Sequence, residues 1–424
     1  MSNSFPQSDT LGSAGESAKI SKSWLRQRRE MLQLNLRCQL TAEEYRLYRF
    51  YEQDKDYAYM LNFLPIDALR NTFRTTLNDP NWKVLLDNKW LFHMHYEQFG
   101  LSLPQAYGLY DQGAGFTKTG KPLTTSEDLR TFFDEVRPRS LVAKPLGGIM
   151  GKQVLILKEI QYQNGELQAV ANTGERFNFD QLAKMLEQPP NVRYYMSGGY
   201  KLALTGYLLE EKLEQHTFLD VLAPYTINTI RVVTFLNHQH DVDVHFTVLR
   251  LGRQGNMADN WDRGGISVAI DPTTGVLGEG IIKPKYGGQW VQVHPDSGVR
   301  FTGQQLPYWS QILALCIEAA KVTPKVRTVG WDVAITPAGP VLIEGNPDWD
   351  LEMVQVHTNG FLQPEVRTQL AHFGLKFPEK TLPSFSPKAW WVRLREQSRG
   401  RAFTGGGSLP YRVSRRLRKM VRGR

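Results

Sequence analysis

Short apolar runs rich in Val, Ile and Leu alternate along the chain with segments whose apolar residues recur at helical spacing. The first pattern is typical of β-strands and the second of α-helices. The predicted strands are Ala106–Tyr110, Leu141–Ala143, Val154–Leu157, Leu167–Asn172, Thr229–Phe235, Val242–Leu251, Val329–Ile335 and Pro340–Ile343. The predicted helices are Ser126–Val136, Asp180–Glu187, Leu306–Val322 and Phe361–Phe373, with another that starts at Asn88 and ends near Gly100.

The last two strands are joined by Thr-Pro-Ala-Gly at 336–339, which predicts a β-hairpin because Pro and Gly favour a turn. Asp332 lies in the first strand. Glu344 and Asn346 end the second, where side-chain alternation points both to one side. Pairing of the strands would gather three oxygen donors, a set that suits Mg²⁺. The alternative is that Asp332 is a solvated strand residue and 344–346 a turn.

A glycine-rich loop follows the strand Leu141–Ala143. The strand ends in Lys144, and the loop contains Gly147, Gly148 and Gly151. A Lys that leaves a strand offers a point charge to phosphate, and glycines let backbone N–H groups approach closely. It is not a Walker A loop, because no Gly-Lys-Ser/Thr follows and the next element is a predicted strand. The alternative is a Gly-rich hairpin with a surface Lys.

Two arginines, Arg231 and Arg250, lie inside apolar predicted strands, where a charge needs a partner. A phosphate or acyl phosphate would be such a partner, because the guanidinium fork binds two oxygens at once. The alternative is a structural ion pair.

Several metal-ligating residue types lie near the start of strand Val242–Leu251, namely His238, His240, Asp241, Asp243 and His245. Their spacing also fits a polar turn followed by an alternating strand with Val242, Val244 and Phe246 on its other face. The second interpretation is favoured over a transition-metal site.

The composition is that of a soluble globular protein, with 41% hydrophobic and 22% charged residues among 424, enough for two or three domains. Its two cysteines, Cys38 and Cys316, lie in unrelated contexts, which fits a reducing cytosol and not a disulfide framework. We find no signal-peptide core at the N-terminus and no run near the ~20 apolar residues of a spanning helix. The predicted location is the cytoplasm.

The N-terminal part divides in two. Residues 1–19 are Ser- and Gly-rich and predicted to be disordered, and 20–87 form a predicted helical region. Thr41 to Glu44 has the pattern of a capped helix start. An aromatic-rich stretch, 45–59, predicts packing against a neighbouring domain, with a nucleic-acid stacking surface as the less favoured alternative.

Together, the glycine loop (Lys144–Val154) and the Asp332…Glu344-x-Asn346 set resemble the ATP-grasp superfamily of ATP-dependent ligases. Three further segments resemble its sugar-transfer-associated branch, namely Asn228–Phe235, Leu249–Gly252 and Asp259–Ile266. The resemblance covers about Asn88 to Gln355. It implies an α+β ATP-grasp fold in which two lobes clasp ATP, here over residues 88–375.

The resemblance also implies ATP and Mg²⁺ as cofactors, with Asp332, Glu344 and Asn346 as metal ligands. The residues implied at the nucleotide are Lys89, Lys144, Gly147, Gly148, Gly151, a hinge at Glu211, Lys212 and Leu213, and Glu214 or His216 at the ribose. Lys89 has a solvated helix Lys as its alternative. Arg231 resembles the family's arginine near the transferred phosphate, and Arg250 and Lys144 complete the expected catalytic set.

The expected substrate-binding residues are Asn228, Asn260, Arg263, Gly264 and Lys283. Asp259 to Ile266 resembles a flexible active-site loop. Lys283 or Lys285 would meet an anionic substrate, with solvated loop lysines as the alternative.

The resulting hypothesis is a ligase that activates a carboxylate as an acyl phosphate for attack by an amine or hydroxyl. The family's association suggests cell-surface polysaccharide biosynthesis. The rival hypotheses are a small-molecule kinase on the same fold and a non-catalytic nucleotide-binding or scaffold protein.

The net charge of +9 is concentrated at the C-terminus. Residues 388–424 hold twelve Lys and Arg against one Glu, which leaves the rest of the chain at −2. Trp390, Trp391 and other apolar residues are interspersed. Cations mixed with interfacial aromatics fit a contact with an anionic membrane, here the inner membrane face, with a solvated tail or an acidic partner as alternatives. Nucleic acid is the less favoured partner.

We therefore expect the basic tail (376–424) to bind anionic liposomes, because each Lys or Arg near such a surface contributes about 1 kcal/mol. Sedimentation at low salt should carry the full protein down with anionic but not neutral liposomes, and a chain truncated after Pro387 should stay in solution. Equal binding by the truncated chain would show that the tail is not the anchor.

Overall fold

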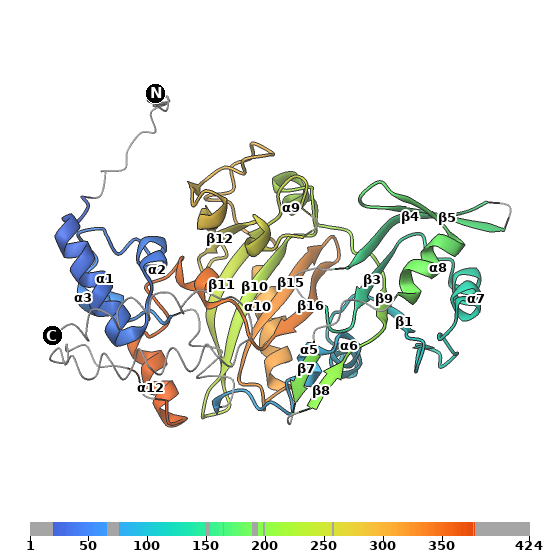
Figure 1. Ribbon diagram of the computed structural model, residues 1–424, viewed down its shortest axis with the longest axis horizontal. Helices are drawn as coiled ribbons and strands as arrows, with labels where there is room; N and C mark the ends of the chain where they lie inside the picture. The colour runs from blue at the N-terminus through green and yellow to red at the C-terminus, as the bar shows by residue number, and fades with distance from the viewer. Residues whose placement is uncertain are drawn as a thin grey trace, which may run out of the picture.

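The computed structural model describes residues 20–65, 76–148, 153–163, 165–188, 194–197, 200–256, 258–375 and 377. They form an α+β fold with two seven-stranded antiparallel sheets side by side and helices packed on them (Figure 1). The predicted α+β class is confirmed. A separate two-stranded sheet consists of β7 (Tyr194–Ser197) and β8 (Tyr200–Ala203).

The smaller lobe is a sheet with two helices on one face. Its strands, in spatial order, are β2 (Phe116–Thr117), β1 (Ala106–Tyr110), β9 (Tyr207–Glu210), β3 (Leu141–Pro145), β4 (Leu155–Gln163), β5 (Glu166–Ala171) and β6 (Arg176–Asn178). Helices α7 (Ser126–Val136) and α8 (Phe179–Glu187) pack on it through a buried core that includes Phe133 and Leu182.

The larger sheet is buried on both faces, which explains its nearly continuous apolar runs. Its spatial order is β14 (Trp290–Val291), β13 (Leu277–Ile282), β12 (Ile266–Ile270), β11 (Val242–Leu251), β10 (Thr229–Leu236), β15 (Thr328–Thr336) and β16 (Gly339–Asn346). The predicted hairpin is confirmed, because β15 and β16 pair antiparallel around residues 337–338.

Side-chain alternation along β10 assigns the two faces of this sheet. Ile230 and Val232 pack in one core with helix α10 (Trp309–Lys321), whereas Val233 and Phe235 belong to the core on the opposite face. That opposite core also contains buried residues of the N-terminal helices and of α11 (Leu351–Gln355) and α12 (Pro364–His372). By the same alternation, the side chain of Arg231 projects toward the face that carries Val233 and Phe235. We call this the second face.

The N-terminal helices are α1 (Trp24–Cys38), α2 (Ala42–Leu47), α3 (Tyr57–Met60), α5 (Val84–Asp87) and α6 (Lys89–Glu97). The predicted cap of α2 is confirmed, since Thr41 Oγ1 accepts from the Glu44 N–H at 3.1 Å and the Glu44 carboxylate accepts from the Thr41 N–H at 2.7 Å. The aromatic stretch is packing surface, because Tyr45, Tyr48 and Phe50 are buried in the core shared with the large sheet. A stacking surface for nucleic acid would need exposed rings.

Some element ends differ from the sequence prediction. Strand β4 runs past the apolar run to Gln163, because it pairs with β5 along its whole outer part, where Ile160 and Leu167 still belong to the buried core. Helix α10 begins at Trp309 and not at Leu306. Strands β12 and β13 extend the large sheet beyond β11, where the sequence predicted only a loop edge.

The remaining described helices are short and lie in connections. They are α9 (Thr217–Leu222), the 3₁₀ turn η2 (Trp261–Arg263) and the 3₁₀ turn η3 (Pro284–Tyr286). Within the described ranges, no helix has the length and apolar character needed to cross a membrane.

Gln355 joins the N-terminal region to the end of α11. It is fully buried, its amide nitrogen donates to Leu64 O and Tyr48 Oη, and its amide oxygen accepts from the N–H groups of Leu64 and Phe361. Each of these backbone groups would otherwise be buried without a partner, which is costly.

Gln355→Leu should lower the free energy of unfolding by about 2–4 kcal/mol, because it orphans buried donors and acceptors. Urea denaturation checks this value. The exposed residue Gln98 supplies the control, since Gln98→Leu should change stability by less than about 0.5 kcal/mol. Equal effects of the two substitutions would contradict the bridging role.

Candidate active site

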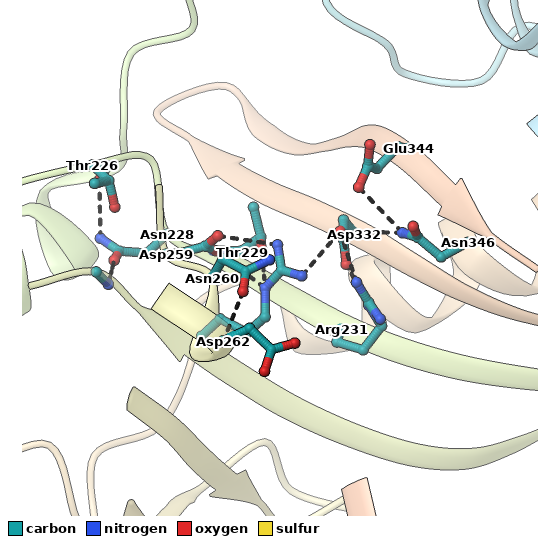
Figure 2. Close-up of polar contacts among 12 residues, drawn as sticks. Thr226, Asn228, Thr229, Arg231, Asp259, Asn260, Asp262, Asp332, Glu344 and Asn346 are labelled. Atoms are coloured by element: carbon teal, nitrogen blue, oxygen red, sulfur yellow. Dashed lines mark hydrogen bonds and ion pairs between the residues drawn. The ribbon is translucent and has the colours of Figure 1, made fainter. Parts of the chain in front are cut away.

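The register of three strands aligns alternating charges on the second face of the large sheet. Arg231 on β10 lies directly opposite Asp332 on β15, with Nε 2.5 Å from Oδ1 and Nη2 3.0 Å from Oδ2. Arg250 on β11 adds a second guanidinium 3.2 Å from Asp332 Oδ2. Both arginines are therefore in ion pairs, and Figure 2 shows Arg231 beside Asp332.

Asp259 extends this row at its other end. Its carboxylate accepts from the Thr229 N–H at 2.9 Å, from Thr229 Oγ1 at 2.6 Å and from Arg250 Nη2 at 3.1 Å. The result is a buried ladder, Asp259–Arg250–Asp332–Arg231, which we call the charge ladder. Its four side chains come from β10, β11, β15 and the segment before η2. Figure 2 labels three of them, Asp259, Asp332 and Arg231.

The two carboxylates of the charge ladder differ in acidity. Burial alone would raise the pKa of Asp332, but the positive charges of Arg231 and Arg250 outweigh it and lower that pKa. Burial raises the pKa of Asp259, and the charge of Arg250 only partly offsets this. Asp332 is thus the firmly ionised member.

Glu344 and Asn346 meet Asp332 at the end of the hairpin, as predicted. Asn346 Nδ2 lies 3.3 Å from Asp332 Oδ2 and 3.3 Å from Glu344 Oε1 (Figure 2). The side chain of Glu344 is 35% exposed, whereas that of Asp332 is 1% exposed. The solvated-strand and simple-turn alternatives are wrong, because Asp332 is buried and 344–346 belong to β16.

These residues fit Mg²⁺ only in part. Glu344 offers a partly exposed carboxylate at the end of the hairpin. The contacts of Asn346 with Asp332 and Glu344 are made by its Nδ2, which leaves its side-chain oxygen Oδ1 for a cation. Asp332 already accepts from Arg231, Arg250 and Asn346, so it would have to release a donor before binding a cation. In the described ranges no three His, Cys, Asp or Glu side chains form a metal cluster, and His245 instead contacts Gln369 and stacks on Phe235.

Two lysines lie where the lobes meet. Lys89 Nζ donates to Gly148 O at 2.7 Å and lies 4.0 Å from Glu344 Oε2, so it connects the glycine loop with the hairpin. Its side chain is only 16% exposed, and burial lowers its pKa, so the solvated-helix alternative is wrong. Lys144 is also mostly covered and pairs with the buried carboxylate of Glu210, which excludes the surface-Lys alternative.

The glycine loop is tightly packed where it is described. A Cβ at Gly147 would lie 3.2 Å from Leu204, and one at Gly148 would lie 3.2 Å from Pro145. These contacts leave little room for larger residues at either position. Gly151 lies outside the described residues.

The expected hinge connects the two sheets. After β9 the chain runs through 211–216, and the His216 N–H donates to Ile335 O of β15 at 2.8 Å. The carboxylate of Glu211 accepts from the Gln105 N–H at 2.8 Å, and Lys212 and Leu213 are half-buried. His216 Nδ1 caps α9 by accepting from the Phe218 N–H, whereas Glu214 is exposed. Of the two ribose candidates, Glu214 is therefore the more available.

The predicted substrate residues have unequal roles. Asn228 is fully buried and its amide is engaged by Gln215, Ala223 and Gly252, so it supports loops and is not open to a substrate. The amide oxygen of Asn260 caps η2 by accepting from the Asp262 N–H at 2.8 Å. The structure therefore does not favour Asn228 as a substrate residue, whereas Asn260 is half-buried and stays a prediction.

The loop predicted to be flexible is anchored by Trp261. This ring is buried and its Nε1–H donates to Ile281 O at 2.9 Å. Gly264 ends η2 at a φ of 92°, a conformation that favours glycine. Arg263 is half-buried, and within the described part of the chain its guanidinium has no ion pair.

Lys283 is not a solvated loop lysine. Its ammonium pairs with Asp262 at 2.6 Å and with Glu352 at 2.8 Å, and it lies over the Trp261 ring. The nearby carboxylates raise its pKa against the effect of burial. An anionic substrate would have to compete with two carboxylates for it, whereas Lys285 is half exposed.

The sequence interpretation missed three buried acids, Glu210, Asp259 and Glu352. Each pairs with a predicted cation, namely Lys144, Arg250 and Lys283. Only Glu210 ends an apolar run, and the sequence holds no comparable signal for Asp259 or Glu352.

Comparison with known proteins identifies the class. The profile of the sugar-transfer associated ATP-grasp family matches residues 68–369, and the chain belongs to this family. The resemblance seen in the sequence is thereby confirmed. No curated protein sequence matches the chain.

Solved structures also match the chain, at low identity and with low TM-scores. The ADP complex of N5-carboxyaminoimidazole ribonucleotide synthetase is 11% identical, covering 70% of this chain and 54% of that one, with a TM-score of 0.35. D-alanyl-alanine synthetase A from Vibrio cholerae is 11% identical (70% and 63%, TM-score 0.34). Biotin carboxylase from Campylobacter jejuni is 12% identical (66% and 48%, TM-score 0.35). The chain spans less than two thirds of the length of each.

Asp259→Asn should lower the free energy of unfolding by about 2 kcal/mol, because it removes a charge-assisted partner of buried Arg250. Chemical denaturation measures the change. Asp180 pairs with Arg130 at the surface, so Asp180→Asn is the matched control and should cost less than about 1 kcal/mol. Wild-type stability of Asp259→Asn would refute the ladder's structural importance.

Proposed function

We propose that the protein is an ATP- and Mg²⁺-dependent ligase that activates a carboxylate for attack by an amine or hydroxyl. The observation that carries this proposal is the position of Lys89. Its ammonium contacts the glycine loop of one lobe and approaches Glu344 of the other, so cationic and metal-binding groups converge where the lobes meet. Membership of the ATP-grasp family supports the same assignment.

The proposed nucleotide and metal contacts follow from this convergence. Lys89, Lys144 and the backbone N–H groups of the glycine loop would bind phosphate oxygens, residues 211–213 the adenine, and Glu214 the ribose. Glu344 and Asn346 would hold Mg²⁺, with Asp332 joining them after a partner exchange. Bound there, the cation would neutralise charge on the phosphate oxygens.

Arg231 and Arg250 have the proposed catalytic role. Both are held on the buried sheet face by Asp332, and Asp259 supplies the second carboxylate that balances their charge. A phosphoryl oxygen can replace the carboxylate of Asp332 as their partner, and that would free Asp332 for the cation. The substrate carboxylate would accept the phosphoryl group, and the amine or hydroxyl would then displace phosphate from the acyl carbon. Positioned charges are sufficient for such chemistry.

We extend the proposal to cell-surface polysaccharide biosynthesis in the cytoplasm, with the basic tail near the inner membrane face. The support is the family description, which associates it with sugar transfer. The proposed function is tested by an ADP-release screen of the full chain with carboxylates, amines and sugar nucleotides. A new amide or ester supports the ligase. A stable phosphomonoester would indicate a kinase. Nucleotide binding with neither Mg²⁺ dependence nor turnover would indicate a non-catalytic scaffold protein.

Glu344→Gln should keep the fold and reduce ADP release by about 10²-fold or more, because the amide retains shape but loses the charge that holds Mg²⁺. Glu318 is an exposed Glu on α10 that pairs only with Lys321 among the described contacts, so Glu318→Gln is the control with wild-type turnover. Wild-type ADP release by Glu344→Gln would refute the metal assignment.

A further inference from the structure

A cavity of about 290 Å³ lies between the N-terminal region and the large sheet, near the lower end of the ~300–1,000 Å³ range of small-molecule pockets. Tyr48, Arg49 and Tyr59 line it from the N-terminal side, and Glu279 and Trp290 from the sheet. The N-terminal wall precedes residue 68, where the family match begins. The N-terminal wall of the cavity therefore lies outside the part of the chain that the family profile matches.

The cavity is beside the charge ladder on the same sheet face. Arg250 on β11 lies directly opposite Ser267 on β12, and Ala269, two residues further along, lines the cavity. Two residues of strand span about 7 Å. His357 also lines the cavity, and its Nε2 is 2.9 Å from Ser267 Oγ. A ligand in the cavity would therefore lie within one small molecule's length of Arg250.

The cavity wall combines aromatic surface with balanced charge. Arg49 lies over the Trp290 ring at 5.4 Å, and Lys55 lies over the Tyr59 ring at 4.3 Å. These two cations are matched by the carboxylates of Glu52 and Glu279, both in the wall. A net anion or cation gains little from such a wall, whereas a neutral ligand with many hydroxyl groups can use both kinds of side chain.

His357 adds a polar ring to the cavity wall. Its Nδ1 is buried, and within the described residues it has no hydrogen-bond partner. Burial lowers the pKa of His357 to about 3, so the ring is neutral at pH 7. A neutral imidazole nitrogen can bind a hydroxyl group as donor or acceptor according to its tautomer.

We propose that this cavity binds a neutral saccharide ring, with the aromatic side chains against its C–H surface and the polar side chains at its hydroxyl groups. An amphipathic ring of this kind matches a wall that is both aromatic and polar. A role for the bound saccharide as the hydroxyl nucleophile of the ligase rests on the proposed function. Binding of the saccharide to the cavity does not.

The test is binding of monosaccharides to the full chain without nucleotide. Glucose, galactose and N-acetylglucosamine are titrated by saturation-transfer NMR and calorimetry, with inorganic phosphate as the anionic comparison. We expect saturable binding of at least one sugar, with a Kd in the millimolar range, and none of phosphate. The absence of ATP separates this result from any failure of the ligase proposal.

Two cavity variants and one control complete the test. Trp290→Ala removes an aromatic wall, and Asn359→Trp fills the rim from an exposed position that the fold does not depend on. Both should weaken sugar binding at least tenfold. Trp24 is 65% exposed and outside the cavity, so Trp24→Ala should bind like wild type. Absence of sugar binding, preference for phosphate, or unchanged affinity in Asn359→Trp would overturn the proposal.

Discussion

The charge ladder, Asp259–Arg250–Asp332–Arg231, is the interaction on which the rest of the site depends. Arg231 and Asp332 are buried between apolar strands, where an unpaired charge would cost far more than the pair gains. Removing any one member leaves its neighbour uncompensated. In the proposed mechanism an anion at the arginines would therefore have to arrive together with a cation at Asp332, so that no buried charge is left unpaired.

The antiparallel register of the strands positions Arg231, Asp332 and Glu344 next to one another. Arg231 faces Asp332 across one strand pair, and Glu344 faces Asp332 across the next. Lys89 on α6 and the segment 211–216 after β9 then reach the hairpin and β15. The N-terminal helices close the far end of the same face and form one wall of the cavity. The charge ladder and the cavity thus lie on the same face of the sheet.

Features with local causes could be predicted from the sequence. The hairpin around 337–338 and the cap at Thr41 depend on neighbouring residues, and both were predicted correctly. Asp259, Glu210 and the burial of Asn228 could not be predicted, because they depend on strands distant in sequence. The burial of Lys283 could not be predicted for the same reason, since its partner Glu352 is on α11. Residue types indicated the chemistry, and only the register showed which charges neutralise one another.

The central claim is that the metal and phosphate groups meet at the hairpin and exchange partners with the charge ladder. A crystal structure of the full chain with Mn²⁺ and a non-hydrolysable ATP analogue tests it directly. We expect an anomalous peak against Glu344 and Asn346, with Asp332 turned toward it and Arg231 or Arg250 on a phosphate. A metal peak elsewhere, or a bound nucleotide with the Arg231–Asp332–Arg250 contacts unchanged, would contradict the account.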